Sequence, residues 1–228
     1  RAVDTKSNEI TAIPELLDLL ILNGAIVTID AMGTQKDIAA KIRKRKADYV
    51  LALKGNQGTL HDDVEDFFND PVLSADSHDH RDTSFGHGRI EERVCRVADA
   101  RPWLNERHPD WVDLNTIVEI MATRTNKKTG AISRETRLYI SSLPPDPVLI
   151  AAACRSHWSV ENNLHWQLDV TFREDECRTR KDHAPLNFAV IRHTALNMLK
   201  REPSKMSLKR KRLKAAVNPE FRKMLLAC

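Results

Sequence analysis

The stretch Ala25-Ile-Val-Thr-Ile-Asp30-Ala-Met-Gly33 is an apolar run that ends abruptly in an acid and a glycine. Such a run is typical of a buried parallel strand, which would deliver the carboxylate of Asp30 to the carboxyl end of a sheet. Asp30 is therefore the first candidate for a site residue. The alternative is that Asp30 only forms a turn or caps a helix before Met32 and Gly33.

The segments on both sides of this run alternate between helix and strand patterns. A helix with apolar spacing precedes it at residues 9–22, and a basic amphipathic helix follows at residues 35–46. A second buried strand covers residues 48–54. This alternation predicts an α/β fold with a parallel sheet, helices on its faces and ligands at the carboxyl ends of the strands. Both Asp30 and the Lys54–Gln57 turn are expected at that edge.

The pattern changes after residue 58. An acidic helix at 60–68 and a polar loop through Ser84 come first, and short strand-like runs follow at residues 89–97, 116–123 and 133–141. Asn126-Lys-Lys-Thr-Gly130 predicts a hairpin turn between the last two runs. We therefore divide the chain into a partial α/β core, a β-rich insertion, further core helices and a basic tail, at residues 1–58, 59–145, 146–200 and 201–228.

A second candidate acid lies in Arg155-Ser-His-Trp-Ser-Val-Glu-Asn-Asn-Leu-His-Trp-Gln-Leu-Asp169, which we interpret as one buried helix. Helical spacing places His157, Glu161 and His165 on one face, while an apolar face can pack nearby through Val160, Leu164 and Leu168. A carboxylate near an apolar surface usually has a partner. Two acids from distant segments suggest a metal site, although spacing alone favours Glu161 as a surface acid paired with a neighbouring histidine.

Two carboxylates that hold divalent metal ions can support phosphoryl transfer, because the ions activate an attacking hydroxyl and neutralise charge on the phosphodiester. Phosphate contacts are expected from the glycine-rich segment 85–91, where His87 and Arg89 can donate, unless it is only a tight turn before a strand. The Lys54-Gly-Asn-Gln57 turn could contact DNA through Lys54, Asn56 and Gln57, or could simply cap a strand. The polar cluster of His78, His80 and His87 does not match a known zinc spacing.

The charge of the chain is unevenly distributed. The 228 residues carry a net charge of +4, yet residues 178–228 hold 14 Lys and Arg against 3 Asp and Glu. A basic segment attracts nucleic-acid phosphate, although a solvated basic helix would have the same composition. The four cysteines form no CxxC pair, so neither a disulfide framework nor a zinc module is indicated. No membrane span or secretory signal is found, which favours a cytoplasmic protein.

Six ordered motifs resemble the DDE transposases of the H-repeat-associated protein family (As-one type) of bacterial insertion sequences. These motifs are Lys6–Pro14, Thr28–Gly33, Ala52–Gln57, Gly86–Glu91, Arg155–Trp158 with Glu161-Asn162, and Leu164–Asp175. The resemblance covers nearly the whole chain. It implies a ribonuclease-H-like mixed sheet with flanking helices, interrupted by a mainly β insertion.

The same resemblance implies cleavage and strand transfer of insertion-sequence ends with Mg²⁺, for which Mn²⁺ could substitute. Asp30 matches the second acid of the family's triad and Glu161 the third, so both are expected to be catalytic metal ligands. The implied partners are the terminal repeats and the target DNA, with a homodimer in the synaptic complex. The residues expected to contact DNA are Lys54, Asn56, Gln57, His87, Arg89, Arg155, His157, Trp158 and Lys181.

The chain departs from the family's pattern at two places. The first acid of the triad belongs to an Asp-Gly-Lys sequence, and none occurs here, so we expect an N-terminally truncated chain that lacks the first strands and is inactive alone. Where related transposases have Tyr, Arg and Lys around the glutamate, this chain has Cys154, His157 and Leu168. The alternative functions are a non-catalytic DNA-binding remnant and a nuclease that cuts DNA without joining it.

Overall fold

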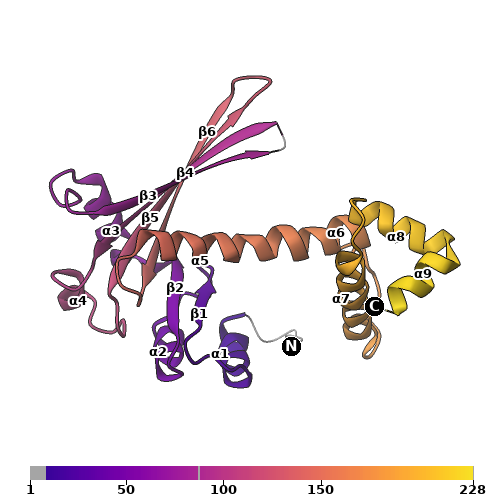
Figure 1. Cartoon of the computed structure of the whole chain (residues 1–228). Helices are drawn as coiled ribbons and strands as arrows, with labels where there is room; N and C mark the ends of the chain where they lie inside the picture. The colour runs from indigo at the N-terminus through magenta and orange to yellow at the C-terminus, as the bar shows by residue number, and fades with distance from the viewer. Residues whose placement is uncertain (1–8, 87, 228) are drawn as a thin grey trace. The chain divides into compact units, whose positions relative to one another are not determined.

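The structure of the chain is a computed structural model that describes residues 9–86 and 88–227, without the side chains of Glu9, Glu161 and Asn162. The described chain forms two compact units, and the boundary between them in the sequence falls between His157 and Trp158. The first unit is built on a sheet and the second consists of helices (Figure 1). No described helix is long and apolar enough to cross a membrane.

A six-stranded mixed sheet forms the centre of the first unit. Its order is β1-β2-β6-β5-β4-β3, with β1 parallel to β2 and every other neighbouring pair antiparallel. The strands are β1 (Ile26–Ile29), β2 (Asp48–Leu53), β3 (His78–Gly86), β4 (Arg89–Asp99), β5 (Thr116–Asn126) and β6 (Ile132–Ser141). The predicted parallel arrangement is thus confirmed for the first two strands, and the sheet as a whole is mixed.

Helices cover both faces of this sheet because the side chains of its central strands alternate between two apolar clusters. On β2, Tyr49 and Leu51 belong to one cluster, whereas Val50 belongs to the other, together with Ile150 and Cys154 of helix α5 (Pro147–Val160). The first cluster includes residues of the remaining helices, which are α1 (Glu9–Leu19), α2 (Lys36–Lys44), α3 (Thr59–Asn69) and α4 (Leu104–Arg107). The first unit is therefore a three-layer α/β structure.

The segment predicted as a polar loop through Ser84 is in part a strand, so that prediction was wrong. Residues His78–Gly86 form β3, which pairs with β4 along its whole length. Its side chains are polar and mostly exposed, and none of them belongs to either apolar cluster of the sheet. The backbone hydrogen bonds to β4 make this segment a strand, although its polar composition is typical of a loop.

The β-rich segment 59–145 continues the same sheet. β6 pairs with β2 through Val50 and Ser141, and the hairpin predicted at Asn126–Gly130 is confirmed between β5 and β6. The amide of Gly130 donates to the carbonyl of Asn126 over 2.8 Å to close the turn. The division of the chain at residues 58, 145 and 200 stays a prediction.

The second unit is helical and has a small apolar centre. It contains a π-helix at Glu161–His165, α6 (Trp166–Phe172), α7 (Ala184–Arg201), α8 (Leu208–Val217) and α9 (Pro219–Leu226). Leu199, Phe221 and Leu225 form its buried apolar cluster. Lys211 is buried as well and donates to the carboxylate of Glu202 over 3.0 Å. The segment predicted as a basic tail thus forms two helices, and its Lys211 is buried in an ion pair within the unit.

Candidate functional site

Asp30 follows the last residue of β1 and is exposed. Its carboxylate oxygen Oδ1 accepts hydrogen bonds from the backbone amides of Met32 (3.2 Å) and Gly33 (3.3 Å). The turn-forming role left open by the sequence is therefore present. The other oxygen, Oδ2, accepts no hydrogen bond from the residues that the structure describes. The same carboxylate can form the turn and offer one oxygen to a ligand.

The loop after Asp30 lies beside the end of β2, at the sheet edge where the sequence predicted both, and it is held there by hydrogen bonds. The buried Thr34 hydroxyl lies 3.0 Å from the carbonyl of Asp30 and 2.7 Å from that of Ala52. The Asn56 amide donates to the carbonyl of Ala31 over 2.8 Å, and the Gln57 amide donates to that of Thr34. Asn56 and Gln57 therefore hold the Asp30 loop, and their expected contact with DNA stays a prediction.

Gly33 is required by close packing. A Cβ atom at this position would lie 2.4 Å from Cγ2 of Ile29 and 2.7 Å from Cδ1 of Ile13, which real Cβ atoms essentially never do. The glycine lets the loop fold back over the end of β1 and against α1. Together with the hydrogen bonds from the β2 end, this contact fixes the position of Asp30.

Helix α5 is joined to β1 by a hydrogen bond near Asp30. Nδ1 of His157 lies 3.0 Å from Oγ1 of Thr28, which precedes Asp30 by two residues on the strand. Sequence reasoning missed Thr28, although a hydroxyl residue within an otherwise apolar strand was a usable signal. The nearby Arg155 forms an ion pair with Asp82 of β3. Contact of Arg155 and His157 with DNA stays a prediction, and both side chains already have protein partners.

The predicted single buried helix from Arg155 to Asp169 is wrong in two respects. It is interrupted by the π-helix Glu161–His165, and much of it is exposed, including Val160 and Trp166. A π-helix closes its turns with i→i+5 hydrogen bonds, so it shifts the register of the side chains after it relative to a continuous α-helix. Glu161 begins this segment, and its side chain lies outside the described part of the structure. Such π-segments occur frequently at functional sites.

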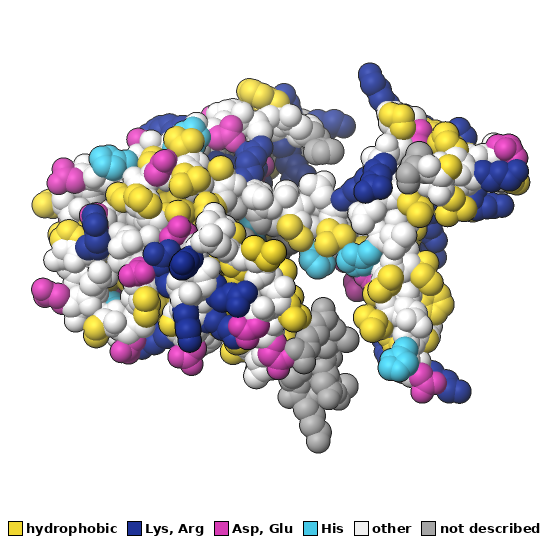
Figure 2. All heavy atoms as spheres, turned by 60° about the horizontal axis from the view of Figure 1, so that its bottom comes forward, with side chains coloured by type: hydrophobic (Ala, Val, Ile, Leu, Met, Phe, Trp, Pro, Cys, Tyr) yellow, Lys and Arg dark blue, Asp and Glu magenta, His cyan; other side chains and the backbone are white. Residues whose placement is uncertain are grey.

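The remaining predicted DNA contacts fall on several elements. Lys54 is exposed at the end of β2, and Arg89 is exposed at the start of β4. Trp158 is half-buried, and Lys181 is exposed in the second unit. His87 lies outside the described residues. Lys and Arg side chains are spread widely over the second unit, as Figure 2 shows in dark blue.

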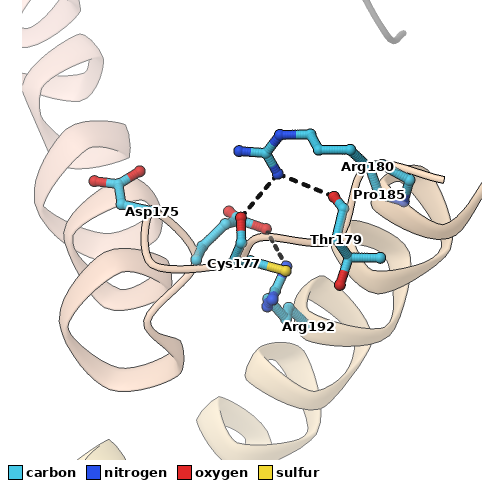
Figure 3. Close-up of a pocket in the computed structure, with 7 residues that line it drawn as sticks. Asp175, Cys177, Thr179, Arg180, Pro185 and Arg192 are labelled. Atoms are coloured by element: carbon cyan, nitrogen blue, oxygen red, sulfur yellow. Dashed lines mark hydrogen bonds and ion pairs between the residues drawn. The ribbon is translucent and has the colours of Figure 1, made fainter.

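A pocket of about 250 Å³ in the second unit was not foreseen from the sequence (Figure 3). Arg192 lines this pocket, donates to the carboxylate of Glu174 over 3.2 Å and forms a hydrogen bond with the thiol of Cys177. The hydrogen bond from Arg192, helped by bonds from Thr179, lowers the pKa of Cys177 from 9.0 to about 7. Burial has the opposite effect on Cys95 and Cys154 and raises the pKa of each to about 12. No sequence motif marked this contrast, because it depends on which side chains surround each thiol.

The site can be tested for its fit to a divalent metal ion. In the described part of the chain, no three side chains of His, Cys, Asp or Glu come together as a complete metal site would require. This holds also for His78 and His80, which lie on β3. Asp30 does fit the part of an oxygen ligand, because it is exposed and one of its oxygens is unengaged by described residues.

Asp30 lies at the carboxyl end of a parallel strand, which is where open α/β sheets bind their ligands. Comparison with known proteins gives the family: a model described as "Transposase DDE domain" matches residues 2–198. The chain belongs to the DDE transposase family, as its motifs predicted.

Three relatives align with 98% of this chain. It is 43% identical to "Putative transposase YncI" of Escherichia coli O157:H7 and 41% identical to "H repeat-associated putative transposase YhhI" of E. coli K12. It is 42% identical to "Putative protein YbfL" of the K12 strain. The chain spans only 58–60% of the length of these relatives.

Proposed function

We propose that this chain is the part of a DDE transposase that binds the ends of an insertion sequence and contributes Asp30 and Glu161 to metal-dependent cleavage and strand transfer. The fold we propose for the sheet and its flanking helices is ribonuclease-H-like. The single observation that carries the proposal is the position of Asp30 at the end of β1, within a chain whose family is that of DDE transposases. Both the reaction and the DNA substrate are proposals for the whole protein.

In this proposal Asp30 and Glu161 hold Mg²⁺, or Mn²⁺ in its place. A bound divalent ion supplies charge neutralisation at the phosphodiester and activates the attacking hydroxyl. The chain's contribution is to fix the Asp30 carboxylate before substrate arrives, since Oδ1 is held by two backbone amides and the loop is braced by Thr34. Preorganised charge of this kind needs no rearrangement during the reaction.

DNA binding is assigned to exposed cations on both units. Lys54 lies beside the Asp30 loop, and residues 158–228 carry 15 Lys and Arg against 8 Asp and Glu, an excess of seven positive charges. Such a surface binds phosphate with an affinity that falls steeply as salt rises. The proposal therefore predicts DNA binding by this chain that weakens strongly with increasing salt.

The test separates the two roles of Asp30 with a matched pair of variants. Asp30→Asn keeps an oxygen that can accept from Met32 and Gly33 but removes the charge, whereas Asp30→Ala removes both. Mn²⁺ binding by calorimetry is measured on this chain. Mn²⁺-dependent cleavage is measured on a protein extended with the remaining segments of the O157:H7 relative. We expect Asp30→Asn to lose Mn²⁺ binding and to lower cleavage by at least about a hundredfold.

Equal cleavage by Asp30→Asn and the unchanged protein would overturn the catalytic assignment and leave Asp30 as a turn residue. Glu161→Gln is tested in the same way. Salt-dependent DNA binding without cleavage in the extended protein would instead support the alternative, a non-catalytic DNA-binding protein. Cleavage without joined products would support a nuclease of this fold.

A further inference from the structure

The outer end of the sheet brings two hairpin turns together in the first unit. We call this region the ribbon tip and define it as residues 84–86, 88–90 and 124–134. Arg89 pairs with Asn126 at the end of the β4–β5 ladder, and the amide of Lys127 donates to the carbonyl of Gly88 over 2.9 Å. Gly88 (φ +74°) and Gly130 (φ +70°) provide the positive φ angles of the two turns. Figure 1 shows strands β3 to β6 projecting beyond the helices of their unit.

The ribbon tip carries positive charge without any acid. Its described residues include five cations and no Asp or Glu. One of them, Arg124, is neutralised by Glu91 (2.9 Å) and Glu135 (3.2 Å) just inside the tip. The other four are exposed and form no ion pair with any described residue; they are Arg89, Lys127, Lys128 and Arg134. Four unpaired cations in so small an area are suited to a polyanion.

An exposed aromatic ring lies among these cations. The Phe85 side chain is 70% exposed, although it occupies an ordered position in the β3–β4 pairing opposite Ile90. Nζ of Lys127 lies 5.2 Å from the centre of its ring. Because the Phe85 ring is exposed to solvent, it contributes little hydrophobic stabilisation to its own unit. A ring beside phosphate-binding cations matches the way in which proteins bind unstacked bases.

We propose that the ribbon tip binds unpaired nucleotides of DNA, with Phe85 stacking on a base and the surrounding cations binding the backbone. The inference rests on the proposed function for the identity of the polyanion, and it adds a site and a substrate form to it. Bases inside a duplex present their faces to one another, so Phe85 has a partner only where a strand is unpaired. The chain is therefore expected to bind a duplex with a single-stranded extension more tightly than a blunt duplex.

The test measures the affinity of the full chain for both duplexes by fluorescence anisotropy. Phe85→Ala and Phe85→Leu should each weaken binding to the extended duplex by about five- to a hundredfold, since stacking is worth roughly 1–3 kcal/mol per base. Their affinity for the blunt duplex should hardly change. The Leu variant keeps an apolar side chain without a flat ring, and Phe85→Trp should retain the preference. Thermal unfolding checks that every variant is folded.

The cations are tested through the salt dependence of binding. Lys127→Ala should lower the slope of log affinity against log salt by about 0.9 on the blunt duplex, which corresponds to one lost phosphate contact. Lys44→Ala is the matched control, because Lys44 is an exposed lysine on α2 away from the ribbon tip. Its slope should stay unchanged.

Equal affinities of Phe85→Ala and the unchanged chain for the extended duplex would overturn the stacking site. Equal slopes for Lys127→Ala and Lys44→Ala would overturn the backbone contact, and so would an absence of any DNA binding. These outcomes leave the Asp30→Asn test unaffected, because that test measures metal binding and cleavage. Failure of the ribbon tip and failure of the proposed function can thus be told apart.

Discussion

The two units of this chain are stabilised in different ways. In the first, a sheet is covered on both faces and buries large side chains such as Tyr49, Leu51 and Ile140 completely. In the second, three apolar residues form the buried cluster, and a buried pair of Lys211 and Glu202 ties α8 to the end of α7. The first unit therefore holds Asp30 at the end of a well-buried sheet, whereas the second exposes Lys and Arg side chains on helices that share a small core.

The largest effect on this difference between the units is expected from removing an aromatic ring from the apolar cluster of the second unit. Phe221→Ala should destabilise that unit by about 3–5 kcal/mol, because a nearly buried ring is lost from a cluster with few other members. Calorimetry should show a lower Tm for one transition only, while the transition of the sheet unit stays in place. Met224→Ala on the exposed side of α9 is the control. A single transition that shifts as a whole would refute independent stabilisation of the units.

A smaller effect is expected from overpacking the sheet edge. Gly33→Ala should destabilise the first unit by about 1–3 kcal/mol, because its Cβ would press on Ile29 and Ile13. Chemical denaturation monitored by tryptophan fluorescence measures the loss. Gly55→Ala provides the control, since a Cβ at that position meets nothing within 4 Å. Similar losses in both variants would mean that the Asp30 loop does not depend on this contact.

The bond between β1 and α5 should contribute less again. Thr28→Val removes the hydroxyl that meets His157 but keeps the shape of the side chain, at an expected cost of about 0.5–1.5 kcal/mol. Thr28→Ser restores the hydroxyl and should recover most of that stability. Urea denaturation of the three proteins measures the difference. A valine variant as stable as the parent would show that the bond does not help to hold α5.

The weakest effect concerns reactivity rather than stability. In a Cys228→Ser background, iodoacetamide should label Cys177 with a rate that rises with pH and is half-maximal near pH 7, because the thiolate is the nucleophile. Cys95 and Cys154 should react far more slowly, since burial raises their pKa to about 12. Arg192→Ala should move the midpoint for Cys177 upward, toward the ordinary value of 9.0. Mass spectrometry of the labelled peptides measures these rates. A midpoint that Arg192→Ala leaves unchanged would contradict the role given to Arg192.

The strands with apolar runs were predicted from the sequence, and a strand without one was missed. β1 and β2 were expected from their apolar runs and are present at 26–29 and 48–53. β3 has no apolar periodicity because none of its side chains belongs to an apolar cluster of the sheet, so it was taken for a loop. The interruption of the helix at Glu161–His165 could not be foreseen either, since a π-helix has no composition of its own.

At the candidate site, too, some features were predicted from the sequence and others were not. The meeting of the Asp30 loop with the end of β2 was predicted, because parallel strands bring their carboxyl ends to one edge. The two bonds from backbone amides to Asp30 were an alternative that the sequence left open. The packing of Gly33 against Ile13 and the bond from Thr28 to His157 were not predicted. Each depends on side-chain directions that residue spacing along the chain does not specify.

The sequence by itself determined the family, the identity of the two candidate acids and the basic character of the C-terminal part, because these reside in motifs and in charge. The tertiary structure decided which cations are paired with acids of the chain and which stay exposed and unpaired. Lys211 is buried against Glu202 and Arg124 is paired with two acids, whereas Lys127 and Lys128 remain exposed at the ribbon tip. The physical reason is that charge is a property of a residue, whereas its neutralisation depends on neighbours that only folding brings near.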